Sequence, residues 1–214
     1  MNLRSLIATP IDKLSFAVVD TETTGMSPKF NRIIDIGIVK VKNGTIIDKW
    51  DTLIDPQQQL DPWITKYTHI YDYHLKGKPL FNTFIPKITD MLTGSVFVGH
   101  NVGFDYSFLH SEMSRHGKSF NYPKLCTVLL GRKLLPQLAN AHLDAISDYY
   151  NITISARHRA LPDAEATAII LLEFIEKAKK ELNAKTFFDL DRIQYLKINK
   201  QESQPPPAKV GLFS

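Results

Sequence analysis

The sequence has 214 residues, of which 43% are hydrophobic and 22% are charged, and its formal net charge is +4. This length suits one domain with a substantial core. No apolar stretch approaches the roughly 20 residues that cross a bilayer, and residues 1–10 lack the apolar segment of a secretory signal. Cys126 is the single cysteine, so an intrachain disulfide is excluded. We therefore expect a cytoplasmic protein with no membrane partner, whose modest positive charge permits a polyanionic ligand without requiring one.

An apolar run at residues 16–19 ends abruptly in acidic and hydroxyl side chains. Such a run predicts a central strand covered on both faces. If the strand continues, its period of two places the carboxylates of Asp20 and Glu22 on one face, about 7 Å apart. Two carboxylates so placed can share a metal ion, but acidic pairs also occur at ordinary solvated strand ends. Only residues elsewhere in the sequence can distinguish a metal site from an ordinary strand end.

Two further β-rich runs, residues 32–42 and 45–54, are separated by Asn43 and Gly44. An Asn-Gly dipeptide between such runs is a strong hairpin signal. The first three strands are therefore predicted to form an antiparallel meander. Asp35 interrupts the second strand, and we expect it to be an exposed strand residue rather than a partner of a site.

Residues 55–79 are irregular and rich in aromatic side chains, and they predict short helical turns around residues 64–75 with structural histidines. The apolar spacing of residues 80–92 predicts a helix, in which Pro86 would introduce a kink or a shift.

A short apolar strand at residues 95–99 leads into an amphipathic helix at about residues 102–116, an order typical of parallel βα units. Asp105 lies in the first turn of that helix, where the helix dipole favours a carboxylate, so by itself it is an ordinary helix-start acid. Residues 125–135 and 142–150 predict two more helices.

A basic loop leads at about residue 160 into a long helix that is predicted to end near Leu182. Asp163 lies in its first turn, after a proline whose missing amide is tolerated there. Residues 186–196 predict a last short helix. We expect a single domain over residues 1–198, with its core at about 14–180, and a disordered tail at 199–214.

Three motifs occur in order: DTETTG at residues 20–25, HNVGFD at 100–105 and HRALPDAEAT at 158–167. Together they resemble the motifs of the DEDDh 3′–5′ exonucleases, a ribonuclease H-like superfamily that includes the epsilon proofreading subunit of bacterial DNA polymerase III. The resemblance covers about residues 14–180. It implies an α/β fold with a mixed five-stranded sheet, in which an antiparallel three-strand meander is extended by parallel strands, and with helices on both faces.

By this resemblance, Asp20, Glu22, Asp105 and Asp163 match the four metal-binding acids, and His158 matches the general base. The resemblance implies two Mg²⁺ ions as cofactors, with Mn²⁺ able to substitute. Two such ions stabilise charge on both the attacking and the leaving oxygen of a phosphodiester, and carboxylates are the hard ligands that they prefer.

The resemblance also implies a binding site for a 3′-terminal nucleotide. The backbone of Thr23 and Thr24 is expected to meet that nucleotide, and Met26 to wedge against its base. Asn101 and Phe104 are expected to line the same pocket. The expected substrate is a single-stranded or frayed 3′ end of DNA, from which nucleoside monophosphates are released in proofreading or repair.

Two alternatives stay open. One is an RNA-trimming 3′–5′ exoribonuclease, because contacts to the 2′-hydroxyl depend on loop geometry. The other is a non-catalytic accessory subunit of a polymerase with the same fold. The filled acidic positions argue against the second, since clustered carboxylates without a metal repel one another.

Three features of the sequence lie outside the motifs themselves: a histidine in a turn, two arginines beside His158, and the C-terminal tail. His69 stands in a turn where many relatives have glycine. Arg157 and Arg159 flank His158 and are expected either to touch phosphate or to face solvent. The tail ends in Leu212 and Phe213, which resemble the end of a sliding-clamp-binding peptide, although Lys209 stands where glutamine is usual. A polymerase or a sliding clamp is therefore the partner considered for this tail.

Overall fold

The computed structural model describes residues 6–196, so the predicted tail and its partner motif lie outside the described residues. The centre is a five-stranded sheet with the order β3-β2-β1-β4-β5. Strand β2 is antiparallel to both β1 and β3, whereas β4 runs parallel to both β1 and β5. The strands are β1 (Ser15–Thr23), β2 (Ile33–Lys42), β3 (Thr45–Leu53), β4 (Val96–Gly99) and β5 (Lys124–Cys126). The expected mixed sheet is confirmed.

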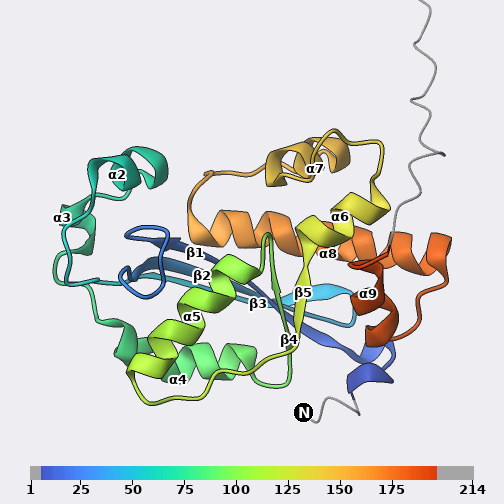
Figure 1. Ribbon diagram of the computed structural model, residues 1–214, viewed down its shortest axis with the longest axis horizontal. Coiled ribbons are helices and arrows are strands. Elements are labelled where there is room, and N and C mark those ends of the chain that lie inside the picture. Colours follow the sequence, from blue (N-terminus) through green and yellow to red (C-terminus); the bar gives the residue numbers. More distant parts are fainter. Residues whose placement is uncertain (1–5, 197–214) are drawn as a thin grey trace, which may run out of the picture.

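Helices cover both faces of the sheet (Figure 1). The long helix α8 packs across β1, β2 and β3, and α6 and α7 pack against α8. The opposite face is covered by α4 and α5. The helical elements are η1 (Ile11–Lys13), α2 (Pro62–Thr68), α3 (Asp72–Leu75), α4 (Phe81–Leu92), α5 (Gly103–Arg115), α6 (Thr127–Leu134), α7 (Leu143–Tyr150), α8 (Ala160–Leu182) and α9 (Phe187–Ile193).

Strand β1 divides its side chains between two cores. Phe16 and Val18 belong to the core shared with α8, whereas Ala17 and Val19 belong to the core shared with α4 and α5. This alternation is the period of two expected for a strand buried on both faces. It directs the next acids of the strand toward the α8 face.

The β2–β3 hairpin confirms the Asn-Gly prediction. Asn43 and Gly44 have φ angles of 52° and 73°, the left-handed conformation that a tight hairpin turn requires. The predicted helix over residues 80–92 is also confirmed, and α4 contains Pro86 within it.

One expected helix was wrong in part. Residues 125–135 were expected to be helical throughout, but Leu125 and Cys126 pair with Val98 and Gly99 of β4 to form β5, and helix α6 begins only at Thr127. A strand of three residues is too short to show an alternating pattern, and its apolar residues also fit the helix that follows. Within residues 6–196, no helix combines the length and the apolar character needed to span a membrane.

Candidate active site

The acidic end of β1 is part of the strand. β1 extends to Thr23, with Asp20 opposite Gly37 and Glu22 opposite Asp35 on β2. Because Asp20 and Glu22 are two residues apart in regular strand, both carboxylates emerge on the face covered by α8. The sheet therefore fixes the backbone of both acids.

Asp105 reaches the same strand from the opposite face. It lies in the first turn of α5 and is only 3% exposed. Its Oδ1 accepts hydrogen bonds from the backbone N–H and from the hydroxyl of Thr21, each at 2.9 Å. This helix-start acid is thus tied to the strand segment between Asp20 and Glu22.

The first turn of α8 lies unusually close to the sheet at Gly37. A Cβ atom on Gly37 would lie 2.5 Å from the carbonyl carbon of Ala160 and from the backbone of Leu161. Only glycine permits this approach. It brings Asp163, one turn into α8, to the acids of β1.

Asp163 completes the acidic cluster and is 4% exposed. Its Oδ2 accepts hydrogen bonds from Nη1 of Arg157 and, at 3.1 Å, from the backbone N–H of His158. Its Oδ1 is buried and has no hydrogen-bond partner in the described part of the chain. Glu22, His158 and Asp163 each offer a ligand atom, and these atoms all lie within 4.8 Å of one another.

The electrostatics of the cluster are unfavourable for four bare carboxylates. Loss of water contact and the nearby Asp163 raise the pKa of Glu22 to about 8, and loss of water contact raises the pKa of Asp105 to about 7. The pKa of Asp20 is raised well above its ordinary range by desolvation and by Asp105, Glu22 and Asp163. Such a set of hard oxygen ligands, with one unpaired buried oxygen, fits a divalent cation.

His158 lies in the loop before α8 with a φ angle of 58°, a conformation uncommon for a residue with a side chain. Its imidazole packs on the ring of Tyr67 from α2, with a centroid distance of 3.8 Å. Partial burial and the nearby Arg157 lower the pKa of His158. The side chain is therefore packed on Tyr67, and its pKa lies below the ordinary value of histidine.

The two arginines beside His158 both form ion pairs with acidic side chains. Arg157 bridges Asp144 on α7, at 2.6 Å, and Asp163 on α8. Arg159 donates through Nε to Asp35 at 2.8 Å. Asp35 is 1% exposed, so the expectation of an exposed strand residue was wrong. Its partner lies too far away along the sequence for any local pattern to reveal it.

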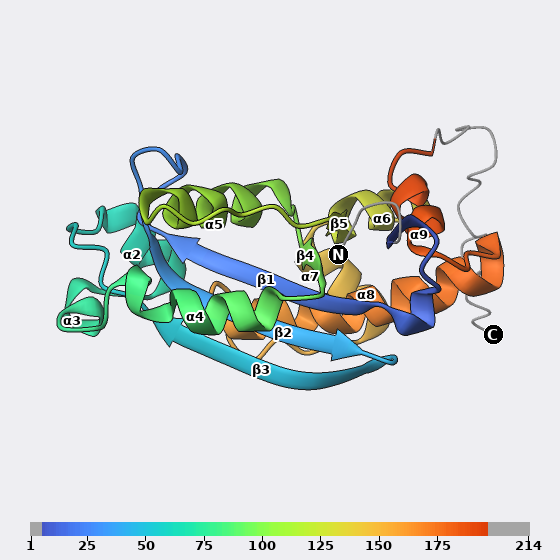
Figure 2. The same ribbon diagram turned by 90° about the horizontal axis from the view of Figure 1, so that it is seen from below.

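All five residues matched to the catalytic and metal-binding positions line one open cavity of about 610 Å³. They are Asp20, Glu22, Asp105, His158 and Asp163. Figure 2 shows the arrangement: β1 ends beside α2, α8 begins near this end of the sheet, and α5 runs from β4 toward it on the opposite face. Residues from the beginning, middle and end of the sequence meet there.

A second cavity of about 280 Å³ is lined by Thr23, Met26, Asn101 and Phe104, four of the five residues predicted to bind substrate. Met26 is 70% exposed. Thr24 is not among the lining residues, because its side chain turns away and donates to Oε1 of Gln58 at 3.1 Å. The hydroxyl of Thr23 also forms a local hydrogen bond, because it donates to the carbonyl of Gly25 at 2.7 Å.

The sequence analysis missed several residues that line these cavities. Trp63 and Tyr67 of α2 are 48% and 54% exposed, and both line the smaller cavity. Their spacing of four on the exposed face of a short helix is a signal that could have found them. His69, at the end of α2, has a φ angle of 57°, which explains why glycine suits this turn. Other residues missed in the larger cavity are His100, Arg132, His142 and Asp144.

The chain belongs to the exonuclease family, because the RNase T exonuclease family model matches residues 17–171. Among curated proteins, the PolC-type DNA polymerase III of Caldanaerobacter subterraneus subsp. tengcongensis is 36% identical over 178 residues, which are 83% of this chain and 13% of that protein. DNA polymerase III subunit epsilon of Aquifex aeolicus is 31% identical over 181 residues, which are 84% of this chain and 90% of that protein. The chain therefore spans about an eighth of the PolC-type relative.

Solved structures share the fold. Exonuclease X in complex with 5′ overhanging duplex DNA superposes with a TM-score of 0.67 at 23% identity, over 85% of this chain and 99% of that chain. E. coli Exonuclease I in complex with a dT13 oligonucleotide superposes with a TM-score of 0.70 at 16% identity, over 80% of this chain and 43% of that chain. The expected ribonuclease H-like architecture is thereby confirmed.

Proposed function

We propose that this protein is a 3′–5′ exonuclease that hydrolyses phosphodiester bonds at the 3′ end of DNA and releases nucleoside monophosphates, in proofreading or repair. The observation that carries the proposal is the meeting of Asp20, Glu22, Asp105, His158 and Asp163 around one cavity. Membership of the exonuclease family supports the reaction class.

The four acids would hold two Mg²⁺ ions, with Mn²⁺ as a substitute. The unpaired buried Oδ1 of Asp163 supports this assignment, and so do the raised pKa values of the buried Glu22 and Asp105, because a bound cation would favour the charged form of both carboxyl groups. When bound, such ions supply Lewis-acid stabilisation of charge on the phosphodiester oxygens.

His158 is the proposed general base. Its lowered pKa favours the unprotonated imidazole, the form that can accept a proton from an attacking water. Tyr67 holds one face of the ring, and the backbone N–H of His158 is fixed by Asp163. The proton acceptor is thus oriented relative to an acid of the cluster.

The smaller cavity is the proposed site of the 3′-terminal nucleoside. Thr23 and Thr24 would meet it through their backbone, and Met26, Asn101 and Phe104 through their side chains. Contacts of these kinds are sequence-tolerant, so the enzyme would read a strand end rather than a base sequence. The described complexes of Exonuclease X and Exonuclease I contain DNA, which supports DNA as the substrate.

The relatives named above are DNA polymerase III proteins. This supports a polymerase as the partner and the cytoplasm as the location of the protein. The tail that would make such a contact, or bind a sliding clamp, lies outside the described residues.

The test is to incubate the purified protein with 5′-labelled single-stranded DNA, frayed duplex DNA and RNA of one sequence, with Mg²⁺ or Mn²⁺. We expect stepwise shortening of DNA from the 3′ end, which His158→Ala or Asp163→Ala reduces by about 10²-fold or more. His110→Ala and Asp148→Ala, which change an exposed histidine and an exposed acid away from the cavity, serve as controls.

Shortening of RNA in preference to DNA would favour the exoribonuclease alternative. A wild-type protein that is inert on all three substrates with either metal would contradict the catalytic proposal and favour an accessory role.

A further inference from the structure

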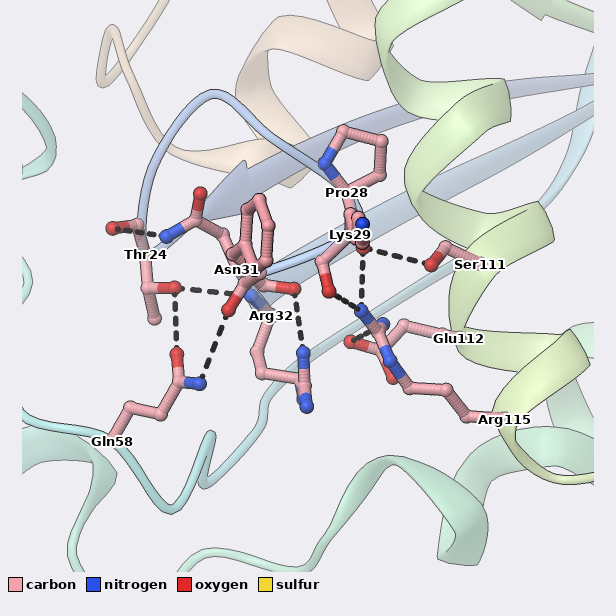
Figure 3. A network of polar contacts seen from close by, with 10 residues as sticks. Thr24, Pro28, Lys29, Asn31, Arg32, Gln58, Ser111, Glu112 and Arg115 are labelled. Carbon is pink, nitrogen blue, oxygen red and sulfur yellow. Dashed lines mark hydrogen bonds and ion pairs between the residues drawn. The ribbon is translucent and has the colours of Figure 1, made fainter.

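Side chains of helix α5 anchor the loop between β1 and β2 through several hydrogen bonds to its backbone (Figure 3). The hydroxyl of Ser111 donates to the carbonyl of Pro28 at 2.8 Å. Nη2 of Arg115 donates to the carbonyls of Pro28 and Lys29 at 2.5 and 2.9 Å. Two side chains of α5 thus hold two successive peptide units of the loop.

Arg115 is itself fixed by a buried acid. Its Nη1 lies 3.2 Å from Oε1 of Glu112, whose side chain is only 3% exposed. Glu112 supplies the negative charge that keeps the guanidinium against the loop (Figure 3). A carboxylate is costly to bury without such a partner, so the pair belongs to one rigid unit.

The base of the loop is closed by a second set of contacts. The backbone N–H of Thr24 donates to the carbonyl of Arg32 at 2.9 Å, and that of Ser27 donates to Oδ1 of Asn31 at 3.0 Å. A Cβ atom on Gly25 would lie 2.6 Å from Nδ2 of Asn31, so a larger residue at this position would displace the Asn31 side chain. Gln58 joins the loop from the other side, donating to the carbonyl of Phe30 at 3.3 Å.

What this fixed loop displays is apolar. Met26 is 70% exposed and Phe30 is 66% exposed. The ammonium group of Lys29 lies 5.1 Å from the centre of the Phe30 ring and takes part in no ion pair within residues 6–196. The contacts above fix the backbone that carries Met26 and Phe30, so both exposed side chains project from an ordered loop and are available to contact a ligand.

Met26 lines the smaller cavity, whereas Phe30 does not. Phe30 therefore lies outside the proposed nucleoside site but on the same fixed loop. An exposed ring with a neighbouring lysine that makes no ion pair in residues 6–196 suits one nucleotide, because the ring can stack on a base and the lysine can pair with a phosphate.

We infer that Phe30 and Lys29 bind a further nucleotide of the substrate strand, outside the terminal-nucleotide site, and that Arg115 is a positioning residue for this contact. The inference rests on the proposed function. It makes the β1–β2 loop a determinant of affinity for a polynucleotide, while hydrolysis of a single nucleotide unit does not depend on Phe30.

Two substrates distinguish binding of the terminal nucleotide from binding of the further nucleotide. The 4-nitrophenyl ester of thymidine 5′-monophosphate offers one nucleotide, and a single-stranded oligonucleotide offers several. We expect Phe30→Ala to leave kcat and KM for the ester within twofold of wild type, and to raise KM for the oligonucleotide about 5- to 30-fold, as loss of one base stack predicts. Phe30→Trp is expected to keep the wild-type KM, because it keeps a stacking surface.

Phe188→Ala is the matched control, since Phe188 is an aromatic residue that is 46% exposed on α9, away from the loop. Lys29→Gln is expected to raise KM for the oligonucleotide and to weaken its dependence on salt. To loosen the loop without leaving a buried charge unpaired, Arg115→Ala is combined with Glu112→Gln. This double variant should raise KM for the oligonucleotide while its thermal unfolding stays cooperative.

An unchanged KM for the oligonucleotide in Phe30→Ala, with the ester still hydrolysed, would overturn the inference and leave the proposed function standing. A wild-type protein that hydrolyses neither substrate would instead refute the proposed function. An equal loss on both substrates in Phe30→Ala would show that Phe30 acts on the terminal nucleotide and would also overturn the inference.

Discussion

Asp35 and Arg159 are 124 positions apart in the sequence, yet Nε of Arg159 donates to Oδ2 of Asp35 at 2.8 Å. The same carboxylate oxygen accepts from the backbone N–H of Ala160, the first residue of α8, at 3.3 Å. Asp35 thus fixes the segment immediately after His158 to strand β2. An acid outside the cavity determines where the proposed general base lies.

Asp35→Ala is expected to lower kcat for oligonucleotide hydrolysis at least about 10-fold with little change in KM, because the loop that carries His158 loses its anchor. The free energy of unfolding should fall by about 1–2 kcal/mol, less than for a fully buried pair because Arg159 is partly exposed. Steady-state kinetics and urea unfolding measure the two effects. Asp35→Asn, which keeps an acceptor for Ala160, should recover part of kcat; a variant with wild-type kcat would contradict this role.

Arg157 neutralises Asp163 in the metal-free protein by a direct ion pair. Arg157→Ala should therefore reduce the stability of the metal-free protein and tighten Mn²⁺ binding about fivefold, corresponding to about 1 kcal/mol for one partly exposed charged contact. Isothermal titration calorimetry measures the affinity, and thermal unfolding in a chelator measures the stability. Arg132→Ala is the control, because Arg132 lines the same cavity without an ion pair in the described chain. Unchanged Mn²⁺ affinity would show that Arg157 does not compete with the metal.

The raised carboxylate pKa values predict how the metal-free protein responds to pH. Folding raises the pKa of Glu22 from 4.5 to about 8 and that of Asp105 from 3.8 to about 7. The folded state therefore holds these protons more tightly than the unfolded state, so stability is lost as pH rises through this window. In a chelator, the urea midpoint should fall between about pH 5 and pH 8. Excess Mg²⁺ should abolish most of this decline, and a midpoint that rises with pH in the chelator would contradict the prediction.

Gly37→Ala tests the close approach of α8 to the sheet. The added methyl group would lie 2.5 Å from the backbone at Ala160 and Leu161, so the helix start must move. We expect a loss of about 1–3 kcal/mol in the free energy of unfolding, as for other overpacked sites, and a fall in kcat because Asp163 moves with the helix. Gly103→Ala is the control: a Cβ atom there meets nothing within 4 Å. Equal stability of the two variants would contradict the steric argument.

Long, strongly patterned segments were predictable from sequence. The apolar run of β1 and the apolar face of α8 each repeat a local signal over many residues, and the Asn-Gly dipeptide is a specific signal for a hairpin turn. β5 was missed because three residues cannot display a period, and it depends on its pairing with β4. The buried state of Asp35 was missed because it depends on Arg159, which a local pattern cannot place. For the site, motif resemblance located the acids and His158, but only the structure shows the arginine pairs and the contact of Tyr67.

Asp105 accepts a hydrogen bond from Thr21 of β1, which lies 84 positions earlier in the sequence. His158 and Asp163 lie just before and within α8, near the end of the described chain. Contacts between such distant segments form only after the later segment has been synthesised, and each must offset the entropy of closing a long loop. During synthesis, a ribosome-bound chain that ends before residue 158 already contains three of the acids but has no proton acceptor and no fourth acid. By the proposed mechanism, hydrolysis begins only once α8 has docked, so an unfinished chain does not cleave the nucleic acid around it.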